Sequence, residues 1–139
     1  MNEVMRKGPI WDLQKLMLKL PQLELPTEHF FANGMYLRHI WVPRGMTIIG
    51  RVHKQEHFAI CALGHFGISD GIRSFEMFAG DVKVSPPGSK RIGYAIVDSV
   101  FITVHRVSQS TDLEAIEDEI SEIDPASPFG VGNELKRLK

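Results

Sequence analysis

Two histidines four residues apart mark the part of this sequence best suited to chemistry. His53 and His57 enclose Glu56 at the head of an apolar run that ends at Gly64. The run is too short for an ordinary helix, and its closing glycine favours a buried strand that leads into a turn. Residues of equal parity share one face of a strand, so Arg51, His53 and His57 should point one way and Glu56 the other. The stretch therefore predicts a pocket lined by imidazoles and a guanidinium.

A divalent transition metal is one candidate occupant of this pocket, although no cofactor is the leading expectation. Neutral imidazoles are common ligands of such ions, and His53 and His57 would supply two of them. His105 or Glu56 would supply a third ligand. His105 shares parity with Thr103 on the last expected strand, and the sequence does not decide which side of that strand faces the interior.

An anion is the other candidate occupant. Arg51, His53, His57 and Arg91 in one barrel mouth would make a positive pocket, and guanidinium forks match the geometry of carboxylate and phosphate groups. In a competing interpretation both histidines are neutral, hydrogen-bonded scaffold groups and the arginines pair with an internal acid. The candidate acids for that pairing are Glu56, Glu76, Asp81 and Asp98.

Other functional classes lack their signatures. No phosphate loop, paired zinc cysteines or dinucleotide fingerprint is present, no serine has a recognisable base spacing, and no catalytic residue is assigned. A net charge of −1 gives no general attraction to nucleic acid or membrane, and neither is expected as a partner. No apolar stretch reaches about 18 residues, so no membrane span is expected. The single cysteine, Cys61, is expected to be buried, which is compatible with a reducing cytoplasm.

Three regions follow one another along the 139 residues. Residues 1–27 are predicted to form an N-terminal helical arm with an extended connector, 28–108 a β-barrel, and 109–139 an acidic helix with a tail. The first helix should cover 9–20, between Pro9 and Pro21. Strands are expected near 35–43, 46–52, 57–64, 65–69, 72–77, 81–85, 91–96 and 99–106. Many short strands at this spacing indicate a sandwich or barrel.

Local signals refine this outline. Asp70-Gly71 predicts a tight two-residue hairpin, because both central positions of that turn need positive φ. Thr111 and Glu114 read as a capping box that opens a helix over 111–123. The apolar stripe of that helix comprises Leu113, Ile116, Ile120 and Ile123. Its other face is predicted to be solvated and comprises Asp112, Glu117, Asp118, Glu119 and Glu122.

Residues 35–106 resemble a cupin, a jelly-roll barrel of two sheets. The first cupin motif places two histidines one residue apart, then a glutamate, then a glycine after six further residues. Counting back from Gly64, His57 occupies the glutamate position, His53 the second histidine position and Arg51 the first. The segment from Gly80 resembles the second motif, GDxxxxPPGxxH, with Arg91 at its last histidine. The resemblance implies a mainly β, cupin-like double-sheet barrel flanked by an N-terminal and a C-terminal α-helix.

The same resemblance bears on metal binding. An ordinary metal cupin offers three imidazoles and one carboxylate to its ion. This chain has arginine at two of the four positions, and arginine keeps its proton in proteins and therefore cannot act as a ligand.

The chain is also similar to small cupin-like proteins encoded by tailed bacteriophages. The segments that carry this likeness are His53 to His57, Pro86 to Ala95, Thr103 to His105 and Thr111 to Glu117. It implies a phage gene source. The long amphipathic arms outside the barrel add the expectation of a non-enzymatic structural or assembly component in the host cytoplasm, incorporated into the virion, with other phage structural proteins as partners. Alternatives are a small-molecule binder that uses the anion pocket, and a metal-dependent cupin enzyme of the isomerase or dioxygenase type.

Self-association is expected from the first helix. Its apolar stripe is larger than a small barrel alone is expected to cover, which predicts a homo-oligomer. The stripe comprises Ile10, Leu13, Met17 and Leu20.

Overall fold

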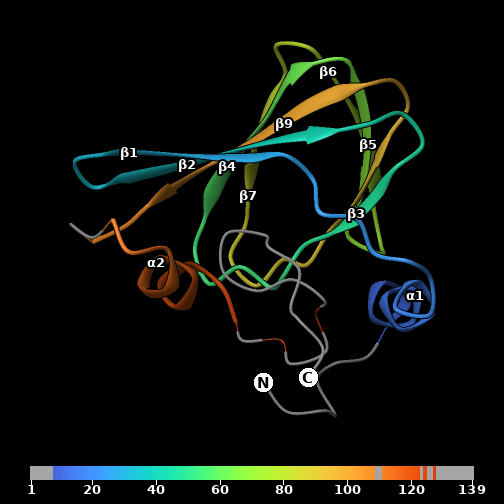
Figure 1. Cartoon of the computed structure of the whole chain (residues 1–139), viewed down its shortest axis with the longest axis horizontal. Helices are drawn as coiled ribbons and strands as arrows, with labels where there is room; N and C mark the ends of the chain where they lie inside the picture. The colour runs from blue at the N-terminus through green and yellow to red at the C-terminus, as the bar shows by residue number, and fades with distance from the viewer. Residues whose placement is uncertain (1–7, 109–110, 123, 125–126, 128–139) are drawn as a thin grey trace.

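The computed structural model describes residues 8–108, 111–122, 124 and 127, and within them two antiparallel sheets face each other with both helices below (Figure 1). The five-stranded sheet has the order β1 (Thr27–Ala32), β2 (Met35–Val42), β9 (Ser99–Arg106), β4 (His57–Leu63) and β7 (Val82–Ser85). The four-stranded sheet has the order β3 (Thr47–Ile49), β8 (Ile92–Ala95), β5 (His65–Ser69) and β6 (Ser74–Phe78). The predicted mainly β architecture with an N-terminal and a C-terminal α-helix is confirmed.

The core lies between the inward faces of the two sheets. Its fully buried residues are Ile40, Val42, Cys61, Phe66, Ile68, Met77 and Ala95. Alternation along the strands places these side chains inward. Gly93 is required by this packing, because a Cβ added there would overlap Cε1 of Phe66.

All eight expected strands are present, with ends that differ by a few residues, but β1 was not predicted. It pairs with β2 through a connection of Asn33 and Gly34, since Ala32 lies opposite Met35. Gly34 has a φ of 74°. Asn-Gly between two strands is the strongest short hairpin signal, so the sequence contained the information.

The predicted two-residue hairpin at Asp70-Gly71 is wrong. Ser69 pairs with Ser74, so the connection has four residues. The Asp70 carboxylate accepts hydrogen bonds from the backbone N–H groups of Ile72 and Arg73, both at 2.8 Å. An aspartate that caps its own loop in this way stabilises a wider turn.

Helix α1 (Pro9–Met17) is shorter than predicted and packs on its own barrel. Ile10 is buried and lies against Gly71. Nε2 of Gln14 donates a 2.8 Å hydrogen bond to Asp124, and Nζ of Lys90 lies 4.1 Å from the centre of the Trp11 ring. No helix in the described ranges is long and apolar enough to span a membrane.

Helix α2 (Leu113–Ile120) begins after Asp112, whose carboxylate accepts a 3.1 Å hydrogen bond from the N–H of Glu114. The cap is therefore Asp112 rather than Thr111. Ile116 and Ile120 pack against Tyr36 and Val107 at the lower end of the five-stranded sheet.

The prediction that the acidic face of α2 is solvated is wrong for Glu117, which is only 6 % exposed. Its buried carboxylate has cationic partners, as described below. Ile123 and, apart from Ser127, the expected tail after Pro125 lie outside the described residues.

Candidate functional site

Three histidine side chains lie together at the inner face of the five-stranded sheet, near α2. His57 begins β4 and His105 lies on the neighbouring β9, where the pairing of Phe58 with Val104 places the two histidines side by side. His53 precedes β4 and forms an isolated bridge with Ser121, the residue after α2. One ring nitrogen from each histidine lies within 4.8 Å of one from the others.

Burial keeps these imidazoles neutral. It lowers the pKa of His53 to about 3 and that of His105 to about 2, with the neighbouring imidazoles and Arg38 adding to both shifts. Burial also lowers the pKa of His57. The sequence left the side of β9 that faces inward undecided, and the structure settles it, since His105 is only 1 % exposed.

Two of the three rings, those of His57 and His105, are oriented by the hydrogen bonds described next. Nδ1 of His57 lies 3.2 Å from the carbonyl oxygen of Gln55, and Nε2 of His105 lies 2.9 Å from Oγ1 of Thr103. Nδ1 of His105 is buried and has no hydrogen-bond partner among the described residues. The rings of His53 and His57 stack beside that of His105, with interplanar angles of 10° and 23°.

This cluster bears on metal binding. The three ring nitrogens lie close enough together to share an ion, but the family's own ligand set is incomplete. Glu56 does not join the cluster, since its side chain is exposed. The other two positions of the cupin metal set are Arg51 and Arg91, which cannot be ligands. The residues present therefore do not fit the family's metal as they are placed.

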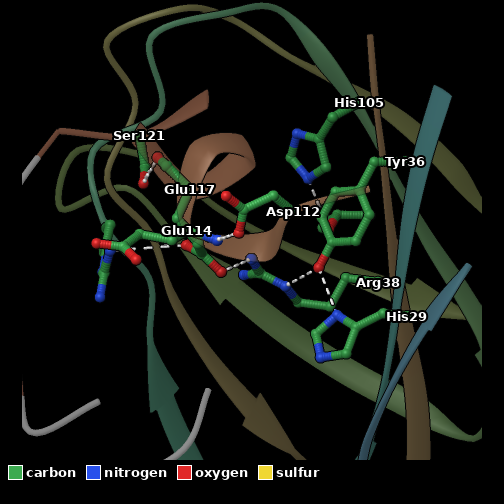
Figure 2. A network of polar contacts seen from close by, with 10 residues as sticks. His29, Tyr36, Arg38, His105, Asp112, Glu114, Glu117 and Ser121 are labelled. Atoms are coloured by element: carbon green, nitrogen blue, oxygen red, sulfur yellow. Dashed lines mark hydrogen bonds and ion pairs between the residues drawn. The ribbon is translucent and has the colours of Figure 1, made fainter. Parts of the chain in front are cut away.

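Three guanidiniums surround the histidine cluster. Figure 2 shows Arg38 of β2 between Tyr36 and Glu117. Glu117 forms an ion pair with Arg38, and Oε2 of Glu117 lies 3.6 Å from Arg51. The Tyr36 hydroxyl accepts a 3.0 Å hydrogen bond from Nε of Arg38 and lies 2.6 Å from Nδ1 of His29. Burial raises the pKa of Tyr36, so this hydroxyl keeps its proton.

None of the four acids proposed as partners of the arginines holds that place. Glu56 is exposed, and Glu76 lies 3.3 Å from His65. Asp81 and Asp98 accept hydrogen bonds from backbone N–H groups in turns. The internal acid comes instead from α2.

Arg91, directly before β8, differs from the other two arginines. Its guanidinium donates a 2.6 Å hydrogen bond to Oγ of Ser85, and its buried Nε has no hydrogen-bond partner within the described part of the chain. No described carboxylate forms an ion pair with it. Burial lowers the pKa of Arg91, which reflects the cost of holding its charge away from water.

The three arginines, Glu117 and two of the three clustered histidines border one cavity of about 150 Å³ between the sheets. Its polar lining includes the four predicted pocket residues, and His105 does not line it. The charged and histidine lining residues are Arg38, Arg51, His53, His57, Arg91 and Glu117. Sequence analysis missed Arg38 and Glu117. The signal for Arg38 was its parity with the apolar inward residues Ile40 and Val42.

Comparison with known proteins identifies the fold. The sequence matches no protein-family model and no curated protein. A cupin superfamily protein from Desulfitobacterium hafniense superposes with a TM-score of 0.54 at 9 % identity, covering 69 % of this chain and 88 % of that one. A cupin-2 domain containing protein from Shewanella frigidimarina gives 0.52 at 12 % identity, covering 76 % and 100 %. The chain has the cupin fold. The cupin domain of Schizosaccharomyces pombe Cnp3 matches this cupin fold with a TM-score of 0.54 at 13 % identity, covering 64 % and 65 %.

Proposed function

We propose that this cupin-fold protein binds a small anion in the cavity between its sheets. The single observation that carries the proposal is Arg91, a cation in the cavity wall that forms no ion pair with a described carboxylate and whose buried Nε has no hydrogen-bond partner among the described residues. Asp70 attracts its charge, but only from beyond ion-pair distance. Desolvating a guanidinium is unfavourable unless an opposite charge lies beside it. A bound anion would supply that charge.

The other two arginines support the scaffold interpretation. Glu117 accompanies Arg38 and Arg51, so these two hold α2 against the barrel. One carboxylate against three guanidiniums still leaves the lining positive. Positive potential in a partly enclosed cavity attracts and retains anions.

Thermal unfolding of the full chain with phosphate, acetate and benzoate tests the proposal. A bound anion at a hundredfold excess over its dissociation constant stabilises the fold by about 2.7 kcal/mol. Such a gain raises Tm by roughly 5–10 °C in a domain of this size. Arg91→Gln should abolish the shift, and the exposed control Arg73→Gln should retain it. No shift with any anion, or equal shifts in the wild type and Arg91→Gln, would refute anion binding.

We propose, as a second role, that the chain assembles with copies of itself through the outer face of the five-stranded sheet. A row of paired outward residues crosses all five strands: Phe30, Leu37, Val104, Phe58 and Val84. A parallel row contains Ile102, Ile60 and Val82. Monomers seldom expose apolar patches of this extent. This role is the part of the phage-assembly expectation that a specific feature supports.

Charge on this face favours a second copy as the occupant. Glu28 of β1 lies opposite His39, and four residues away along β2 Arg106 lies opposite Met35 at the end of β9. A two-fold axis that reverses the strand direction would bring Glu28 of each copy toward Arg106 of the other, as self-complementary interfaces require. Helix α1 is less suited to this role, because Ile10 is already buried on its own barrel.

Sedimentation velocity at micromolar concentration tests the assembly. The test variant is Phe58→Glu, which places a charge on this face at a side chain that is 50 % exposed. The control variant is Ile72→Glu, at a loop position that is 92 % exposed. We expect an oligomer for the wild type and the control and a folded monomer for Phe58→Glu. A monomeric wild type, or an oligomer that survives Phe58→Glu, would contradict the assignment of this face.

A further inference from the structure

We infer that the anion taken by this cavity is a small carboxylate that carries an apolar group about the size of a benzene ring. The inference rests on the proposed function and adds the chemical class of the ligand. It follows from the way polarity changes along the cavity and from the volume available.

The strand register makes one end of the cavity polar. On the five-stranded sheet, His57 lies opposite Ser85, and in the next row Arg38 lies opposite Thr103. Arg91 reaches the same end from the facing sheet, because its guanidinium bonds to Ser85. The head group of a ligand would therefore lie among these side chains.

The opposite end is apolar. One row further along the five-stranded sheet, Ile40 lies opposite Phe101. On the facing sheet, Ile48 and Ile68 lie on either side of Gly93. The Phe66 ring stacks on Phe101 with centroids 5.1 Å apart and forms part of the apolar lining. Successive rows on one face are about 7 Å apart, so the change from charged to apolar occurs within the length of a small molecule.

The volume limits the apolar group. A cavity of about 150 Å³ is the size that holds benzene when its lining is aliphatic and aromatic. A phosphate or acetate at Arg91 would leave the apolar end empty, and water there would lack hydrogen-bond partners. A nucleotide is too large and would bring polar groups into contact with Ile40, Ile68 and Phe101.

The charge of the ligand follows from the arginine inventory. Arg38 and Arg51 already have Glu117 beside them, so Arg91 is the arginine of the cavity lining that forms no ion pair with a described carboxylate. One carboxylate can accept two hydrogen bonds from a guanidinium fork. A singly charged head group therefore matches the site.

Isothermal titration of the full wild-type chain with four probes tests the inference: benzoate, acetate, phosphate and benzyl alcohol. Benzoate should bind at least about tenfold more tightly than acetate or phosphate, because only its ring fills the apolar end. It should also bind more tightly than benzyl alcohol, which has the ring without the charge. Arg91→Gln should lose this preference for benzoate over benzyl alcohol, and Arg91→Lys should retain part of it.

The outcomes separate the two levels of the proposal. Acetate or phosphate binding as tightly as benzoate would overturn the inferred ligand class and leave anion binding intact. Benzyl alcohol equal to benzoate, or no binding by any of the three anions, would overturn anion binding itself. The wild-type series stands alone, so the result does not depend on a variant that fails to fold.

Discussion

Arg38 of β2 and Glu117 of α2 form an ion pair whose side chains are only 12 % and 7 % exposed. The pair joins residues that are 79 positions apart in the sequence. The ion pair links α2 to the β2 side of the cavity wall, because both residues line the cavity.

Glu117→Gln should destabilise the protein by about 3 kcal/mol, since removing one member of a buried pair leaves the other charge without compensation. Urea unfolding measures the change. The exposed Asp118 of the same helix provides the control, and Asp118→Asn should stay within about 0.5 kcal/mol of the wild type. Equal stability of the two variants would mean that the ion pair contributes nothing.

Acid should destabilise the fold through the histidine cluster. The folded-state pKa values of His53 and His105, about 3 and 2, lie below the unfolded value of 6.5, so the unfolded chain binds more protons between these limits. Stability is therefore fully present above about pH 6.5 and falls as the pH decreases. Between pH 6 and 5 the two histidines together should remove about 2–3 kcal/mol.

Urea unfolding at pH 7.5, 6 and 5 checks this expectation. His105→Asn should reduce the slope of stability against pH in that range, whatever it does to stability at neutral pH. A slope that stays flat from pH 7.5 to 5 would show that the imidazoles are not held neutral.

Transition metals should bind poorly, because arginine stands at two of the four family ligand positions and the charges of Arg38 and Arg91 act on the histidine cluster. We expect no stoichiometric metal in purified protein and a Tm change of less than about 1 °C with zinc. Elemental analysis and thermal unfolding measure these quantities. A stoichiometric zinc complex that His105→Asn removes would contradict this expectation and favour a metal site.

Gly93→Ala should cost about 1–3 kcal/mol, because the new methyl group would overlap Phe66 in a packed core. Gly67→Ala on the neighbouring strand is the matched control, since its Cβ would find no atom closer than 3.9 Å. Circular dichroism during chemical unfolding measures both variants. Equal stabilities would show that the core around Phe66 yields readily.

The sequence was most informative about the strands. Turn residues and alternation located eight of the nine in the described chain, and the common parity of Arg51, His53 and His57 agrees with their shared cavity. That parity was derived from a continuous strand, whereas β4 begins only at His57. The residues before it reach the cavity through a bridge to the end of α2.

The candidate site was less predictable, because its charges come from distant segments. The acidic face of α2 contains several similar carboxylates, and only the docking angle of the helix decides that Glu117 is buried. The position of His105 depended in the same way on which side of β9 faces inward. Neither the burial of Glu117 nor the inward side of β9 is encoded locally, since both depend on how the two sheets and the helix pack.

Helix α2 and the residue after it supply Glu117, Ile120 and Ser121 to the cavity wall, although they lie after the last described strand. A chain shortened to residues 1–108 would thus keep every described strand and lose one side of the cavity wall. The complete cavity wall in the described chain therefore needs the barrel together with this helix. Substitutions on this one short helix could change the charge and shape of the cavity while both sheets remain as they are.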